Sequence, residues 1–317
     1  MRGLSNEESI IKIQSSRQRI LYLIIVFFLG AITVLGFAPF YLFPIPVITA
    51  ACLFYFWRKS VSSIQAAQLG FVFGMGMFGV GVTWIYISLH EFGALPMPIA
   101  ILVLIALCAY LSLYITIIGW LVKKIHFNEP LIWVLFVASI WTLSEWLRGV
   151  VPFFGFPWLT MGYSQVPFSP IVGYASVIGV YGISFIIILS ASFISLFFDN
   201  KLRSGRNIMF LSIIWIVGFS LQFINWSEPK GDPVSVSLLQ GNISQEMKWN
   251  PKHVTHTMGT YAKLALASNS RLIVAPEISL PLARDKVPDK YLAQFSTHAE
   301  KNNGDILIGM VETENDS

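Results

Sequence analysis

The residue best placed for acid–base chemistry is Glu277, which stands in the segment Ala275-Pro276-Glu277-Ile278-Ser279-Leu280-Pro281. It follows the short apolar run 271–275, which we expect to form a strand of a parallel sheet. Open α/β sheets place their functional sites at the carboxyl ends of such strands. The two prolines stiffen the loop, and a carboxylate held in a stiff loop can act as a general base. A lone Glu after a strand is otherwise most often a solvated or capping residue, so the residues alone leave both interpretations open.

A second pair of ionisable residues, Glu145 and Arg148, lies three positions apart near the end of an apolar segment. On a helix the two side chains share a face. Ionisable groups at membrane depth are costly and are usually paired. Two interpretations follow: an ion pair that satisfies itself at the membrane interface, or a contact with a lipid headgroup or with the water-soluble part of the chain.

Both cysteines, Cys52 and Cys108, lie in apolar runs. A free Cys in such surroundings is usually a small, inert hydrophobic residue. The sequence contains no CxxC and no spacing typical of zinc ligands. We therefore predict no metal site and no cofactor.

The elements that must position these residues belong to two environments. The 317 residues are 55% hydrophobic and only 12% charged, whereas an ordinary soluble domain is roughly 25% charged. This composition excludes a water-soluble globule for most of the length, and it excludes disordered and collagen-like classes. Residues 1–227 carry 12 basic residues (Lys and Arg) and 6 acidic residues (Asp and Glu). Residues 228–317 carry 9 basic and 11 acidic residues. We therefore expect a membrane part and a water-soluble part.

Apolar segments predict a multi-span α-helical membrane bundle over residues 20–227, preceded by a cytoplasmic segment 1–19. A spanning helix needs roughly 20 apolar residues. The predicted spans are 20–37, 45–57, 64–88, 99–122, 131–149, 171–198 and 207–226. The sixth contains Gly173, Gly179 and Gly182, so we expect part of it to be broken or re-entrant.

The distribution of Lys and Arg predicts the orientation of the bundle. With a cytoplasmic N-terminus, eleven basic residues lie on inner segments and only Arg148 lies on an outer loop. Seven spans then place residues 228–317 outside the cytoplasm. In a bacterium with two membranes, this means that the bundle lies in the inner membrane and residues 228–317 lie in the periplasm. The basic residues occur in short clusters between spans, so the pI of about 9.0 does not indicate nucleic-acid binding.

The predicted outer loop 150–170 is rich in aromatic residues, including Trp158, and carries no charge. Aromatic side chains gather at membrane–water boundaries, so an interfacial belt is one interpretation. The other is the lip of a pocket for acyl chains.

The periodicity changes after the polar linker 228–233. Strands and helices are expected in alternation at 234–240, 251–268, 271–275, 288–302 and 305–310. This order predicts an α/β layer with a parallel sheet. Three strands in 90 residues make an incomplete layer, so we expect residues 228–317 to be the N-terminal part of a larger domain.

Together these segments resemble the bacterial apolipoprotein N-acyltransferase family, in which a membrane bundle is fused to a nitrilase-like (carbon–nitrogen hydrolase) domain. The resemblance covers essentially the whole chain and implies a partial αββα domain after the bundle. The matching segments of the second part are Gln240-Gly241-Asn242-Ile243-Ser244-Gln245-Glu246-Met247-Lys248-Trp249 and Pro276-Glu277 with Pro281. Those of the bundle are Gly36-Phe37-Ala38-Pro39-Phe40, Trp84-Ile85-Tyr86 with His90 and Phe92-Gly93, Glu145-Trp146-Leu147-Arg148-Gly149, and Gly155-Phe156-Pro157-Trp158 through Gly162-Tyr163-Ser164-Gln165.

The resemblance implies a mechanism with a Glu–Lys–Cys triad. A Cys thiolate takes an acyl chain from a phospholipid as a thioester, and the α-amine of a diacylglyceryl-cysteine at a lipoprotein N-terminus then accepts it. Glu277 matches the general base of the family. The other predicted site residues bind substrate: Gln240, Asn242, Trp249, Trp158, Glu145 and Arg148. The implied partners are the phospholipid donor, the lipoprotein acceptor and the membrane, without nucleic acid, and we expect a monomer.

The catalytic Lys and Cys of the family come later in the domain than residue 317, so we expect this chain to be a truncated member that cannot form the thioester alone. The first alternative is a membrane-anchored amidase of the same superfamily, which would use the same triad and release its product to water. The second is a transporter, although the predicted spans hold almost no ionisable residues apart from Glu145 and Arg148, and transport pathways normally need them.

Overall fold

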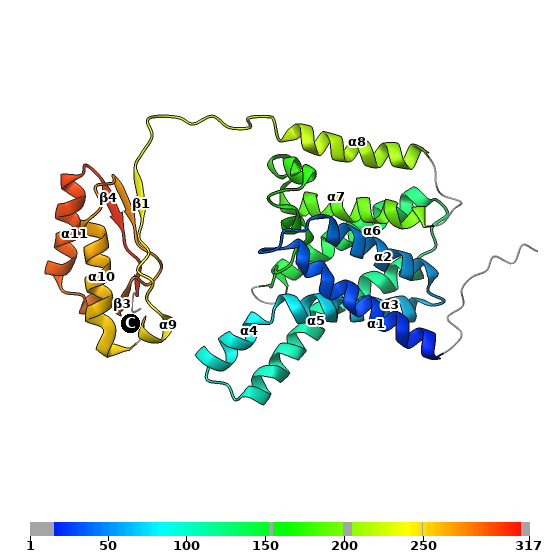
Figure 1. Cartoon of the computed structure of the whole chain (residues 1–317), viewed down its shortest axis with the longest axis horizontal. Helices are drawn as coiled ribbons and strands as arrows, with labels where there is room; N and C mark the ends of the chain where they lie inside the picture. Colours follow the sequence, from blue (N-terminus) through cyan, green and yellow to red (C-terminus); the bar gives the residue numbers. More distant parts are fainter. Residues whose placement is uncertain (1–15, 152–154, 199–204, 249, 312–317) are drawn as a thin grey trace, which may run out of the picture. The chain divides into compact units, whose positions relative to one another are not determined.

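A computed structural model of the protein describes residues 16–151, 155–198, 205–248 and 250–311 (Figure 1). The chain divides into two compact units, Met1–Ser227 and Glu228–Ser317. The first unit is helical, and the second combines strands and helices.

Helices that match the predicted spans form the first unit. Those of 16 or more residues in its described part are α1 (Ser16–Thr33), α2 (Pro44–Lys59), α3 (Ser63–Gly81), α5 (Met97–Lys124), α6 (Pro130–Val150), α7 (Ala175–Phe197) and α8 (Gly205–Leu221). The short helix α4 (Trp84–Ile87) and a π-helix (Ser88–Phe92) lie between α3 and α5.

Five of these helices, namely α1, α3, α5, α6 and α7, are long and apolar enough to cross a membrane. The helices α2 and α8 stand at two further predicted spans but have only 16 and 17 residues. Described helices stand at all seven predicted span positions, and five candidate spans are long and apolar enough to cross a membrane. That α2 and α8 also cross stays a prediction.

Local sequence explains where the helices deviate from the predicted bounds. Pro44 lies in the first turn of α2, the helical position that tolerates proline best, and it sets the start of that helix. The span predicted for 64–88 ends at Gly81 because the C-terminal half of α3 is rich in glycine, which has low helix propensity.

The sixth predicted span is broken, as expected. A 3-10 helix (Pro170–Tyr174) precedes α7, and within α7 the backbone of Gly179 has φ 64° and ψ −172°. This conformation is essentially restricted to glycine. The break at Gly179 separates the first turn of α7 from a regular helix over residues 180–197.

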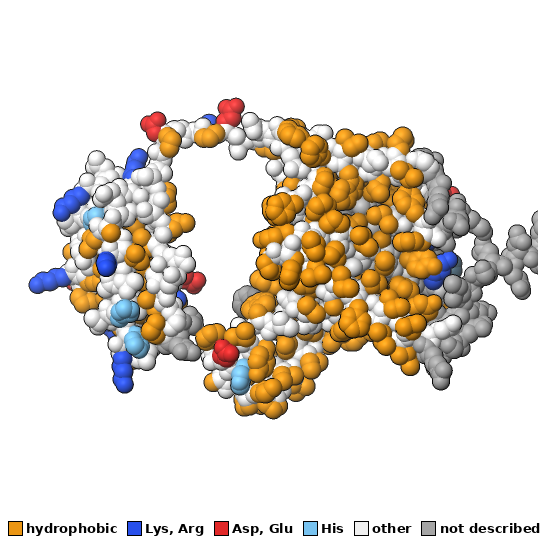
Figure 2. Space-filling model, viewed as in Figure 1, with side chains coloured by type: hydrophobic (Ala, Val, Ile, Leu, Met, Phe, Trp, Pro, Cys, Tyr) orange, Lys and Arg blue, Asp and Glu red, His pale blue; other side chains and the backbone are white. Residues whose placement is uncertain are grey.

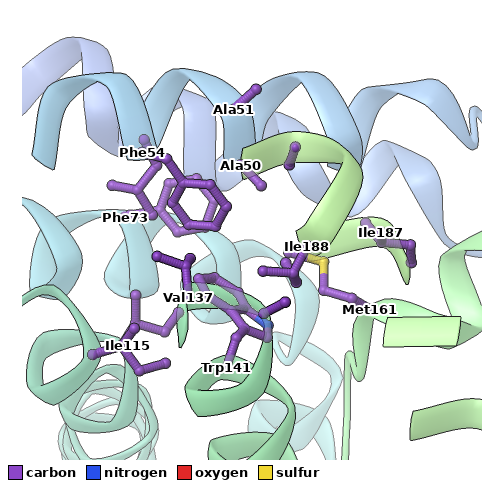
Figure 3. Packing of buried hydrophobic residues seen from close by; sticks show 14 of the residues in the cluster. Ala50, Ala51, Phe54, Phe73, Ile115, Val137, Trp141, Met161, Ile187 and Ile188 are labelled. Carbon is purple, nitrogen blue, oxygen red and sulfur yellow. The ribbon is translucent and has the colours of Figure 1, made fainter. Parts of the chain in front are cut away.

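The core of the first unit is formed by apolar side chains from several helices. Figure 3 shows Phe54 of α2, Phe73 of α3, Trp141 of α6 and Ile188 of α7 gathered in one cluster. The rings of Phe54 and Trp141 meet edge to face, with centroids 5.8 Å apart. Many other large apolar side chains of this unit are exposed, as the orange surface in Figure 2 shows. Apolar side chains both inside and outside fit a bundle that faces lipid.

The helices α1 and α3 cross at two glycines. A Cβ on Gly76 would lie 2.0 Å from the carbonyl oxygen of Phe27, and a Cβ on Gly30 would lie 2.0 Å from that of Phe73. Neither position has room for a side chain, because the neighbouring atoms belong to the backbone. Small residues at such crossings let membrane helices approach closely.

We therefore expect Gly76→Ala to destabilise the bundle by about 1–3 kcal/mol, the usual cost of overpacking. Gly79 of the same helix is the matched control, because a Cβ there meets nothing within 4 Å. Gly79→Ala should be neutral or stabilising by up to about 1 kcal/mol, since Ala has the higher helix propensity. Thermal unfolding of both variants in detergent measures the difference, and equal melting temperatures would contradict the described crossing.

Three short parallel strands form the central sheet of the second unit. They are β1 (Val236–Leu238), β2 (Leu272–Val274) and β4 (Asp305–Leu307), in the order β1-β2-β4. The helices α10 (Val254–Leu266) and α11 (Asp289–Lys301) connect them, and Ala265, Ile273 and Phe295 are buried between helices and sheet. The predicted alternation of strands and helices and the parallel sheet are confirmed.

A second pair of parallel strands, β3 (Leu280–Ala283) and β5 (Met310–Val311), follows the Glu277 loop. The strand predicted for 305–310 is divided, since residues 305–307 pair with β2 and residues 310–311 belong to the strand that pairs with β3. The division falls at Gly309, which packs against the Glu277 loop.

Candidate functional site

Glu277 lies in the loop that leaves the carboxyl end of β2, the middle strand of the central sheet. Its side chain is exposed, and the next residue, Ile278, has φ 51°. This left-handed backbone turns the chain sharply between β2 and β3. The carboxylate thus stands at the sheet edge where parallel α/β folds carry their sites.

Gly309 holds this loop in place. Its carbonyl oxygen accepts hydrogen bonds from the backbone N–H of Leu280 at 3.2 Å and from Ser279 Oγ at 3.0 Å. A Cβ on Gly309 would lie 2.8 Å from both the Ile278 nitrogen and the Pro276 carbonyl oxygen, so the close approach needs glycine. Sequence reasoning missed Gly309 and Ser279 as positioning residues, because only the pairing of β3 with β5 brings them together.

A pocket of about 280 Å³ opens beside Glu277. Gln240 and Asn242, two of the predicted substrate-binding residues, line it together with Glu277. They follow β1, and Gln240 Nε2 donates a hydrogen bond to Asn242 Oδ1 at 2.9 Å. The structure therefore brings three of the predicted site residues to one pocket. Trp249 lies outside the described residues.

Lys248 supplies a positive charge to the same pocket. It is the last residue of α9 (Gln245–Lys248), and its Nζ donates to the backbone carbonyl oxygen of Glu277 at 3.3 Å. Sequence reasoning did not single it out, although it belongs to the segment 240–249 that carries the most specific resemblance. The pocket combines a carboxylate, an ammonium and two amide side chains, which can hold a polar substrate group next to a base.

Glu145 and Arg148 form a separate buried polar cluster in the membrane unit, where each is only 4% exposed. Glu145 Oε1 accepts hydrogen bonds from Trp141 Nε1 at 3.0 Å and from the backbone N–H of Met161 at 2.9 Å. Both side chains lie on α6, one turn apart, as the spacing predicts. The Glu145 carboxylate thus anchors the segment after α6 to the helix.

Arg148 holds the same segment from its other end. Its guanidinium donates to the carbonyl oxygens of Phe156, at 3.1 Å, and of Trp158, and it lies 5.2 Å from the centroid of the Phe78 ring. The two residues therefore clamp the aromatic loop through its backbone, and within the described part of the chain neither has a direct hydrogen bond to the other. Their predicted role in substrate binding stays a prediction.

Trp158 belongs to the clamped loop. Its side chain is 47% exposed, and its ring lies 5.2 Å from that of Trp84 and 6.3 Å from that of Phe156. A rigid loop that presents aromatic rings suits the boundary of a membrane. The interfacial belt and the lip of an acyl-chain pocket both stay predictions for this loop.

The described residues contain no group of three or more His, Cys, Asp or Glu side chains that could hold a metal ion. Cys108 is buried in α5 and Cys52 is half-buried in α2, so both thiols belong to the membrane unit. The groups in the Glu277 pocket are those of acid–base chemistry.

The fold defines the class of protein, a bundle of apolar helices long enough to cross a membrane, joined to an α/β unit. The chain belongs to the apolipoprotein N-acyltransferase family, as the sequence predicts. Residues 29–193 match the family described as Apolipoprotein N-acyltransferase N-terminal domain.

Curated relatives extend this similarity into the second unit. The chain is 53% identical over 290 residues to the apolipoprotein N-acyltransferase of Nitrosomonas europaea, a match that covers 92% of this chain and 58% of the relative. It is 35% identical over 289 residues to that of Chromobacterium violaceum, covering 90% of this chain and 55% of the relative. It is 37% identical over 295 residues to the apolipoprotein N-acyltransferase of Haemophilus ducreyi, covering 90% of this chain and 56% of the relative. The chain thus spans somewhat more than half the length of these relatives.

Proposed function

We propose that this protein transfers a fatty acyl chain from a phospholipid to the N-terminal amine of a diacylglyceryl lipoprotein. The observation that carries the proposal is the position of Glu277, which shares one pocket with Lys248, Gln240 and Asn242 in a chain of the apolipoprotein N-acyltransferase family. In this proposal residues 228–317 are the N-terminal part of a nitrilase-like domain.

The proposed chemistry has two half-reactions, and Glu277 acts in both. Its carboxylate first takes the proton of a Cys thiol, the thiolate attacks the acyl ester, and the proton passes to the departing oxygen of the lysophospholipid. In the second half-reaction it takes a proton from the attacking lipoprotein amine, the amide forms as the thioester breaks, and this proton passes to the departing Cys sulfur. Gln240, Asn242 and Trp249 would orient the polar parts of the substrates. Trp158, held by Glu145 and Arg148, would face the acyl chains.

Neither cysteine of this chain suits the role of nucleophile. Both lie on helices of the membrane unit, and Cys108 is only 2% exposed. The proposed half-reactions therefore use the Cys and the Lys that the resemblance implies, and not Cys52 or Cys108.

We further propose that the bundle lies in the bacterial inner membrane with residues 228–317 in the periplasm. The support is the placement of basic residues at one set of helix ends, including Arg58 and Lys59 of α2 and Lys123 and Lys124 of α5. Both proposed substrates are lipids, so a site at the outer face of the membrane spares them transfer through water.

A reporter enzyme that is active only after export tests this orientation. Fused after Ser235, it should be active, whereas the same reporter fused after Asn128, between α5 and α6, should be inactive. A second reporter that is active only in the cytoplasm should be active when fused after Asn128 and inactive when fused after Ser235. Cytoplasmic activity of the Ser235 fusion would show that the proposed orientation is wrong.

Reconstitution with defined lipids tests the reaction itself. The gene's full product, in vesicles with acyl-labelled phospholipid, should label the amine of an added diacylglyceryl peptide. The amidase alternative rests on the same Glu277 loop, and it predicts labelled fatty acid in water without labelled peptide. Transport would label neither product, so the three functions give three different results.

A further inference from the structure

A pocket of about 320 Å³ in the membrane unit takes no part in the proposed acyl transfer. It lies where α2 and α5 end and α6 begins, and its wall includes Trp57, Lys123 and Trp133. Pro130 at the start of α6 and Arg148 near its end are separated by about 27 Å of helix. The pocket and the Arg148 cluster are therefore at opposite ends of α6.

The charged side chains that line this pocket are the basic residues Arg58 and Lys123, and none of its described lining residues is acidic. The imidazole of His126 lines it as well. Lys123 Nζ donates one hydrogen bond, to the carbonyl oxygen of Arg58 at 3.1 Å. An ammonium has three N–H donors, so Lys123 can still offer two to a ligand.

Packing holds these cations in place. The guanidinium of Arg58 lies 5.5 Å from the centroid of the Trp133 ring and donates to the Ser195 carbonyl oxygen at 3.1 Å. Trp57 is fully buried and packs the C-terminal end of α2 against the core of the bundle. These residues form a cationic pocket with aromatic walls at one end of the helical bundle. The helices that carry them are held in position by the hydrophobic core.

We propose that this pocket binds the phosphate of an anionic phospholipid from the surrounding leaflet. Basic pockets between transmembrane helices bind anionic headgroups, and phosphate oxygens accept charge-assisted hydrogen bonds from Lys and Arg. The membrane itself supplies this ligand at the depth of the helix ends. A lipid held here is a bound partner and not the acyl donor, because the pocket lies far along α6 from the loop proposed to face acyl chains. The assignment of this lipid to the cytoplasmic leaflet rests on the proposed topology, and its distinction from the acyl donor rests on the proposed function.

Native mass spectrometry of the full gene product in detergent tests the proposal without any measurement of acyl transfer. The probes are phosphatidylglycerol, phosphatidylcholine and inorganic phosphate. Lys123→Gln should weaken phosphatidylglycerol binding about fivefold, the usual effect of one cation on an anionic lipid. Lys123→Arg keeps the positive charge and should therefore bind phosphatidylglycerol like the parent protein. A melting curve of each variant shows whether it is still folded.

Lys124→Gln is the matched control. Lys124 is the next residue of α5, but it does not line the pocket, and its Nζ lies 5.1 Å from the centroid of the exposed Trp120 ring. We expect this variant to bind phosphatidylglycerol like the parent protein. Equal weakening by both Gln variants would indicate unspecific attraction and overturn the proposal. So would binding of phosphatidylcholine as tight as that of phosphatidylglycerol, or occupation by inorganic phosphate that excess phosphatidylglycerol does not displace.

Discussion

Glu277→Gln is expected to slow formation of the acyl-enzyme by about 10²- to 10⁴-fold, the usual contribution of a positioned acid–base group. Gln has nearly the same size as Glu but cannot take the proton of a thiol, so the nucleophile would stay neutral. The fold should survive, because the side chain is exposed and the contact with Lys248 uses the backbone carbonyl, which Gln retains. Intact-protein mass spectrometry after addition of phospholipid, without lipoprotein acceptor, follows this step alone.

An exposed carboxylate elsewhere in the same unit provides the control. Glu300 is exposed on α11, away from the loop that carries Glu277, and Glu300→Gln removes an equal charge. We expect its acylation rate to match that of the parent protein. If Glu277→Gln acylates itself within severalfold of the normal rate, Glu277 only solvates or caps its loop and the proposed base is elsewhere.

Arg148→Met should destabilise the membrane unit by about 3–5 kcal/mol, because removal of one buried charge leaves its neighbour uncompensated. Met fills a similar volume but donates no hydrogen bond to the carbonyl oxygens of Phe156 and Trp158. The Glu145 carboxylate would remain buried near it. Thermal unfolding in detergent measures the loss, and released aromatic side chains should also raise protease cleavage within 155–165.

The neighbouring Leu147 is the control for this prediction. It is 37% exposed on the same helix, and Leu147→Ala should change stability by about 0.5 kcal/mol or less. Combining Glu145→Gln with Arg148→Met should cost less than the sum of the two single changes, because the two opposite charges then disappear together. Strict additivity would show that the residues act independently and that the clamp is not one unit.

Hydropathy and periodicity predict most of the architecture of this chain. The apolar segments locate the helices of the bundle, and the glycines of 171–198 predict the break that falls at Gly179. In the second unit the alternation of strands and helices predicts the parallel sheet and places Glu277 at the carboxyl end of one of its strands, which the structure shows to be the middle one. These features depend on local composition and on spacing along the chain, which a sequence displays directly.

Contacts between distant segments are what the sequence does not show. The strand β3 has only four residues and contains Pro281, so it has no clear alternation, and its pairing with β5 depends on register. The position of Gly309 beside Glu277 follows from that pairing. Lys248 reaches Glu277 because the segment after β1 packs beside the loop after β2. The spacing of Glu145 and Arg148 predicts a shared face, but both side chains use the loop backbone as hydrogen-bond partners, because the loop folds back onto α6.

The most direct test of the central claim is the mass of lipoprotein N-termini in cells that depend on this gene. With the parent gene, the N-terminal cysteine should carry a third acyl chain on its amine. With the Glu277→Gln allele expressed at the same level, the account predicts lipoproteins that keep a free amine and only the two chains of the diacylglyceryl group. Fully N-acylated lipoproteins in cells that carry only the Glu277→Gln allele would contradict the assignment of Glu277 as the base of an N-acyltransferase.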